Sequence, residues 1–97
     1  KFKKSEEIGA KREQAHCLLN LGKIYYNKKN ISKSLEVFHK SLLLYEEVND
    51  KEGITLNLTE IGLIYNEQGR NTMAKKYGER AFKTALEISF PIPYTDN

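Results

Sequence analysis

The chain has 97 residues and a formal net charge of +3, with 16 Lys and Arg against 13 Asp and Glu. This length allows one small domain, and the balance of 39% hydrophobic and 30% charged residues is that of a folded globular chain rather than a disordered one. No apolar run approaches the roughly 18 residues needed to span a membrane, and a single cysteine excludes an internal disulfide.

The basic residues do not form the pattern expected of a nucleic-acid binder, which concentrates Lys and Arg on one face. Lys28, Lys29 and Lys33 gather around one predicted turn, and acidic residues accompany most of the others. We interpret the charges as solvated surface and predict neither a nucleic-acid nor a membrane partner. No signal peptide is visible, so the compartment stays open, with the cytoplasm favoured.

The first half of the chain predicts two helices and a fragment. Residues 1–8 match residues 41–48 at a shift of forty, which predicts the end of a preceding helix whose start is missing. Over 11–27, Leu18, Leu21, Gly22 and Tyr25 follow the i, i+3, i+4, i+7 pattern of one helix face. The next helix is predicted over 31–48, with Asn30 or Ser32 as its N-cap.

The second half predicts two more helices and a tail. Asp50 is a natural N-cap for a helix over 51–68, and Gly69 follows it as glycine commonly follows a helix C-terminus. The fourth helix is predicted over 71–89, because Pro91 and Pro93 forbid its continuation and leave 90–97 as a Pro-containing tail. No strand-like alternation appears.

A repeat of forty residues organises these helices. LLNLGKIYYN, which contains Leu21-Gly22, returns as NLTEIGLIYN, which contains Ile61-Gly62. A fixed period of about 20–50 residues is typical of repeat architectures, which present concave binding surfaces. A glycine inside a helix costs about 1 kcal/mol relative to alanine, so its recurrence at one phase predicts a close crossing by a second helix, at Ser34 or Ala74.

The two units resemble the tetratricopeptide repeat. The residues that carry the resemblance are Leu18, Leu21-Gly22, Tyr25, Ser34, Phe38 and Ser41, followed by Leu58, Ile61-Gly62, Tyr65, Ala74 and Ala81. Gly78 departs from the pattern at the second aromatic position, where Tyr77 is expected to serve instead. The period of forty, rather than thirty-four, is similar to repeats in bacterial sensor and regulator proteins.

The resemblance implies an all-α fold in which antiparallel helix-turn-helix pairs stack as a right-handed α-solenoid. The repeat domain is then predicted over 1–89, with a first pair over 11–48 and a second over 51–89. It also implies that the first helix of each pair lines a concave groove. Residues predicted to contact a peptide there are His16, Leu19, Asn20, Lys23, Asn27, Thr59, Glu60, Leu63 and Asn66, with Tyr26, Leu56 and Glu67 on the same face.

Other chemistries find little support in the sequence. Glu13 with His16 and Glu36 with His39 have a helical metal-ligand spacing, but the two pairs should face different sides, so no metal site is predicted. Cys17 is interpreted as a packing residue. No nucleophile–base set, nucleotide loop or zinc spacing appears, so neither an enzyme nor a cofactor is predicted.

The sequence therefore predicts a scaffold that binds a protein or peptide, within a larger bacterial regulatory or sensor protein. The alternative is a structural spacer or oligomerisation module without a ligand of its own. Phe82, Leu86 and Ile88 have no following helix to cover them, which predicts homo-oligomers through the solenoid ends. The segment 90–94 could instead fold back as a cap.

Overall fold

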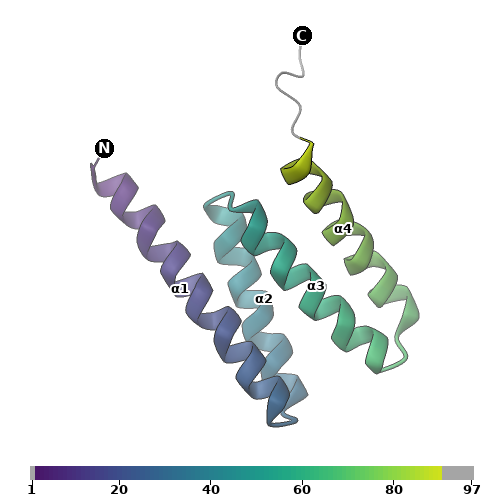
Figure 1. Ribbon diagram of the computed structural model, residues 1–97. Coiled ribbons are helices and arrows are strands. Elements are labelled where there is room, and N and C mark those ends of the chain that lie inside the picture. Colours follow the sequence, from purple (N-terminus) through teal and green to yellow (C-terminus); the bar gives the residue numbers. More distant parts are fainter. Residues whose placement is uncertain (1, 91–97) are drawn as a thin grey trace.

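The computed structural model describes residues 2–90, with side chains from Lys4 onward, as four helices joined by three short turns (Figure 1). The helices are α1 (Phe2–Asn27), α2 (Ile31–Glu47), α3 (Lys51–Glu67) and α4 (Asn71–Ser89), and no strand occurs among the described residues. α1 pairs with α2 and α3 with α4, each pair antiparallel (Figure 1). The predicted all-α fold of stacked helix pairs is confirmed.

The prediction of a separate helix end over 1–8 is wrong, because α1 runs without a break from Phe2 to Asn27. The segment contains no proline, and Gly9 is tolerated within the helix. All residues from 4 to 10 are exposed, so the start of α1 stands apart from the other helices (Figure 1). The fold-back predicted for 90–94 concerns residues 91–94, which lie outside the described residues.

The three turns share one backbone design at a spacing of twenty residues. Each contains a residue with positive φ: Lys29 at 68°, Asn49 at 55° and Gly69 at 75°. The following N–H donates to a tyrosine carbonyl five residues earlier, at 2.9 Å in each turn: Tyr25, Tyr45 and Tyr65. This is the hydrogen bond of a Schellman C-cap. The forty-residue period is thus built from two helix–turn units of twenty, and Gly69 ends α3 as predicted.

Side-chain caps begin two of the helices as predicted. The Asn30 side chain accepts from the Lys33 N–H at 3.3 Å, and Asp50 Oδ1 accepts from the Gly53 N–H at 3.2 Å. Such caps satisfy backbone donors that have no partner within the helix. α4 follows Arg70 and has no side-chain cap.

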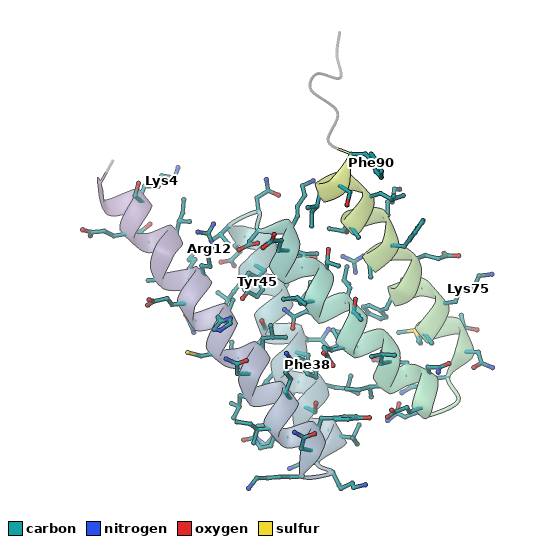
Figure 2. All side chains as sticks on the ribbon, in the orientation of Figure 1. Lys4, Arg12, Phe38, Tyr45, Lys75 and Phe90 are labelled. Carbon is teal, nitrogen blue, oxygen red and sulfur yellow. The ribbon has the colours of Figure 1, made fainter. Side chains whose placement is uncertain are left out.

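The core lies where α1, α2 and α3 meet, around Phe38 (Figure 2). The ring of Phe38 fills the space where Gly22 would carry a Cβ, since a Cβ there would lie 2.6 Å from the ring. Ser34 Oγ donates to the Gly22 carbonyl oxygen at 2.8 Å. The close crossing predicted at Gly22 and Ser34 is therefore confirmed.

The two pairs differ in how much of the repeated apolar face is covered. Leu58 and Ile61 of α3 are fully buried, whereas Leu21, the repeat equivalent of Ile61, is 37% exposed, and Leu18 is half-buried. α2 packs against α3, but no described helix packs on this side of α1. For the same reason Cys17, predicted to pack, is exposed.

The second pair also lacks a ring beside its glycine. A Cβ at Gly62 would meet the Tyr77 Cβ at 3.5 Å and the Gly78 backbone nitrogen at 3.6 Å, both ordinary contacts. The Tyr77 ring packs instead against Tyr65 and His39, with ring centroids 5.6 and 5.9 Å away. Tyr77 thus supplies an aromatic ring to the second pair, but the ring packs on Tyr65 and His39 and not beside Gly62.

Candidate functional site

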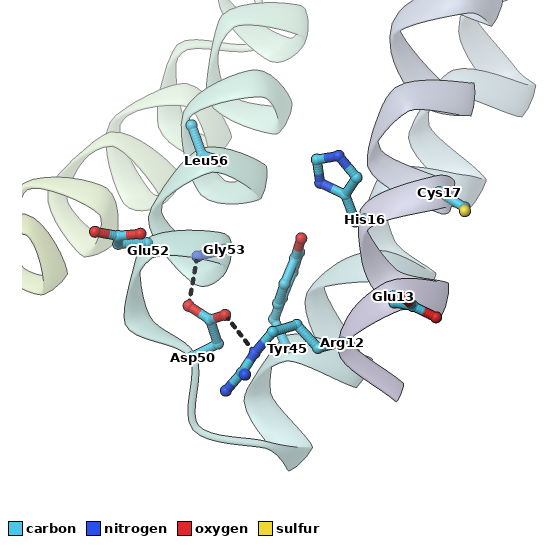
Figure 3. A pocket seen from close by; sticks show the side chains of 9 residues that line it. All are labelled: Arg12, Glu13, His16, Cys17, Tyr45, Asp50, Glu52, Gly53 and Leu56. Carbon is cyan, nitrogen blue, oxygen red and sulfur yellow. Dashed lines mark hydrogen bonds and ion pairs between the residues drawn. The ribbon is translucent and has the colours of Figure 1, made fainter. Parts of the chain in front are cut away.

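A groove of about 610 Å³ opens between the middle of α1 and the start of α3, and we call it the α1–α3 groove (Figure 3). α2 supplies its floor through Tyr45 (Figure 3). The remaining lining residues come from α1, from the α2–α3 turn and from α3: Arg12, Glu13, His16, Cys17, Asp50, Glu52, Gly53 and Leu56.

One charged pair closes the lower end of the groove. Arg12 Nε lies 3.0 Å from Asp50 Oδ2, while Asp50 Oδ1 caps α3 at Gly53 (Figure 3). A carboxylate that bonds both groups fixes the direction of the Arg12 side chain. The guanidinium has five N–H donors, so those not used by Asp50 can meet an acceptor in the groove.

The floor of the groove combines an apolar ring with a polar tip. Tyr45 is buried, and its ring lies against Gly53, where an added Cβ would come within 2.3 Å of it. Burial, helped by the negative charge of Asp50 and opposed by Arg12, raises the pKa of Tyr45. The phenol thus keeps its proton at neutral pH and can donate a hydrogen bond. Leu56, 47% exposed, adds an apolar wall.

A buried polar chain holds the three helices together beside the groove. Asn57 Nδ2 of α3 donates to Ser41 Oγ of α2 at 2.9 Å, and Ser41 Oγ donates to the Ala15 carbonyl oxygen of α1 at 2.7 Å. Both polar side chains are 0% exposed, and among the described residues Asn57 Oδ1 has no hydrogen-bond partner. Because buried polar groups are costly when unpaired, these hydrogen bonds favour one spacing of α1, α2 and α3.

The structure does not bring the nine predicted peptide-contacting residues into one groove. His16 lines the α1–α3 groove. A second groove, between α3 and α4, is lined by Thr59, Leu63 and Asn66, and Asn27 borders a smaller hollow of about 220 Å³ beside Tyr26 and Glu67. Asn20 and Lys23 are exposed along α1, and Glu60 is half-buried on α3.

Leu19 is a correction to the prediction, because it is 2% exposed and belongs to the core. Its position adjoins the apolar face of α1, and α2 and α3 close over it. The lining residues that the sequence did not single out for the groove are Arg12, Glu13, Cys17, Tyr45, Asp50, Glu52 and Gly53. Of these, Asp50 is predicted as a cap, and nothing in the repeat pattern relates Arg12 to it.

The two Glu-x-x-His pairs do not converge. His16 faces the α1–α3 groove, and half-buried His39 packs edge-on against Tyr77. Within residues 2–90 no group of three or more His, Cys, Asp or Glu is placed to hold a metal ion. Within the same range, no helix combines the length and apolar character needed to cross a membrane.

These features define a class of protein: an α-helical repeat scaffold whose grooves lie between stacked antiparallel helix pairs. Residues 13–87 match the family model described as tetratricopeptide repeat. The chain therefore belongs to the tetratricopeptide repeat family, and a protein-interaction scaffold fits that family. Comparisons with curated proteins and with solved structures find no match.

Proposed function

We propose that the chain binds a segment of a partner protein in the α1–α3 groove and that it serves as a recognition module of a larger bacterial regulatory or sensor protein. The observation that carries this proposal is the groove itself, which places an exposed leucine beside fixed hydrogen-bond donors. Concave sites with an apolar lining and a few oriented polar groups are the usual form of ligand sites.

The groove indicates the kind of segment that it suits. Leu56 offers surface for an apolar side chain, and the Tyr45 hydroxyl, Arg12 and His16 offer donors to backbone carbonyls or a carboxylate. Asn20, one helical turn beyond His16, extends the polar surface along α1. An extended segment with one apolar residue beside an acidic residue would satisfy both kinds of contact.

A spacer or oligomerisation module remains the second candidate, and the exposed ends of the stack favour it. Leu21 and Ile24 on α1 are 37% and 49% exposed, and Phe82 on α4 is 67% exposed. Burying such patches against another molecule is favourable in proportion to the apolar area removed from water. This candidate predicts self-association without peptide binding.

Selection from a displayed random-peptide library, followed by titration of the selected peptides, tests the proposal. Leu56→Glu should abolish binding, whereas Leu43→Glu should not, because Leu43 is an equally apolar residue, 61% exposed, on α2. Asn20→Ala and Lys23→Ala are expected to weaken binding more than Glu36→Ala and Lys40→Ala on α2. A library that yields no binder, together with concentration-dependent light scattering, would favour the spacer. Peptides that bind both Leu variants equally would also contradict the proposal.

A further inference from the structure

The groove between α3 and α4, which we call the α3–α4 groove, has a volume of about 600 Å³ and lies on a face of the second pair that no other described helix covers. Gly62 and Gly78 line its centre, and Thr59 and Lys75 lie along it. Lys75 lies on the side of α4 that faces away from α1 (Figure 2). The first pair has an equivalent face forty residues earlier, and α3 covers it.

The equivalent position in the first pair is filled by a ring. Gly78 corresponds to Phe38, which is 0% exposed and occupies the place beside Gly22. An added Cβ at Gly78 would meet no atom within 4 Å. The α3–α4 groove therefore contains the site of an aromatic side chain that no residue in the described part of the chain supplies.

The rim of the α3–α4 groove is polar, whereas the equivalent residues of the first pair are apolar. Thr59, Asn71 and Lys75 stand where the first pair has Leu19, Ile31 and Leu35 against the core. A helix that covers this face must carry polar or acidic residues where α3 carries apolar ones, since an unpaired buried amide or ammonium group is costly.

One contact of α3 with the first pair indicates where a helix docked in the α3–α4 groove would carry an acidic residue. Glu67, at the end of α3, accepts a hydrogen bond from the Tyr26 hydroxyl at 2.5 Å. The residue equivalent to Tyr26 in the second pair is Asn66, which lines the groove and carries an amide donor. A carboxylate at the same place on a docked helix would meet Asn66 and come near the positive charge of Lys75.

The α1 helix of a second copy, stacked in the repeat register, is a poor fit to this groove. If α1 of another copy stacked in the repeat register, Asn27 would take the place of Glu67. Lys28 and Lys29 would then lie beside the α3–α4 turn, which carries Arg70. Like charges placed together oppose association.

We infer that the α3–α4 groove binds an amphipathic helix of another protein that presents an aromatic side chain to Gly78 and a carboxylate to Asn66 and Lys75. This surface is separate from the α1–α3 groove, so the inference does not depend on the function proposed there. The recognition is of the helix-in-groove kind, in which a few side chains anchor the helix.

A peptide with the sequence of α3, residues 51–67, is the natural probe, because α3 covers the equivalent face of the first pair. Ile61 belongs to the same buried cluster as Phe38, so Ile61→Phe adds a ring to the face of the peptide that would meet the α3–α4 groove. Fluorescence anisotropy should show this peptide binding at least about tenfold more tightly than the unmodified one, as expected of an aromatic anchor that fills a pocket.

Substitutions in the chain identify the site. Gly78→Phe should fill the groove with the chain's own ring and weaken binding of the ring-bearing peptide by at least about tenfold. Gly9→Phe should leave binding unchanged, because Gly9 is another exposed helix glycine at which an added Cβ would meet no atom within 4 Å. Lys75→Glu should weaken binding several-fold and Lys76→Glu should not, with circular dichroism confirming that each variant is folded. Absent binding, or equal binding to wild type and Gly78→Phe, would overturn the inference. Self-association of the free chain that Gly78→Phe abolishes would assign the groove to a second copy and overturn it as well.

Discussion

Alanine at the two repeat glycines should affect stability differently, although the local sequences are nearly the same. At Gly62 an added Cβ would make ordinary contacts at 3.5 Å or more. Alanine is favoured over glycine inside a helix by about 1 kcal/mol, so Gly62→Ala should raise the free energy of unfolding by about that amount. For a domain of this size the corresponding rise in Tm is about 4–8 °C.

At Gly22 the same gain in helix propensity meets a steric cost. The added Cβ would lie 2.6–2.9 Å from three ring atoms of Phe38, and this ring is fully buried and cannot swing into solvent. Overpacking of a core costs about 1–3 kcal/mol. The free energy of unfolding of Gly22→Ala should therefore be about 1–3 kcal/mol lower than that of Gly62→Ala. Relative to the wild type, it should be between unchanged and about 2 kcal/mol lower.

Urea denaturation followed by circular dichroism measures both variants. Equal midpoints would refute the packing argument, because propensity alone predicts the same gain at both positions. A double-mutant cycle adds a direct check: with Phe38→Leu in the background, Gly22→Ala should cost less than it does alone, since contacting residues couple.

Three further outcomes follow from buried groups. Ser41→Ala removes a hydrogen bond to the Ala15 carbonyl oxygen and leaves one buried Asn57 amide N–H without its acceptor. Denaturation should therefore show a loss of about 1–3 kcal/mol, against less than about 0.5 kcal/mol for exposed Ser32→Ala. Gly53→Ala should be destabilising by urea denaturation, because its Cβ would come within 2.3 Å of a buried tyrosine ring. Burial lowers the pKa of His39 below its usual 6.5, so the unfolded chain binds more protons in this range and stability should fall as pH drops through about 6.5. Denaturation midpoints between about pH 8 and 5 should lose this slope in His39→Gln and keep it in His16→Gln, and a slope that survives in His39→Gln would contradict the assignment.

The repeat pattern predicted the features that each unit encodes locally. The boundaries of α2, α3 and α4, the caps at Asn30 and Asp50 and the crossing at Gly22 follow from residue type and spacing within about twenty residues. The exposure of Leu21 could not be predicted in this way, because it depends on whether another helix lies beside α1.

The candidate site was predicted less well than the fold. Its charged pair joins Arg12 to Asp50, a contact with no counterpart forty residues on, so periodicity contains no signal for it. Leu19 was misplaced because neighbouring helix positions point about 100° apart, and a residue at the border of the apolar face can turn to either side.

The sparse burial of α4 has a consequence for the motions of the chain. Ala81, 8% exposed, is the one buried residue of α4, whereas α2 buries six, and ion pairs from Glu46 and Lys51 contact exposed parts of α4. Elements with few buried contacts open by local unfolding at lower free energy than the core. Amide protons of α4 should therefore exchange with solvent while those of α2 stay protected. A helix bound between α3 and α4 would slow that exchange. Hydrogen exchange of the α4 amide protons would therefore report whether the α3–α4 groove is occupied.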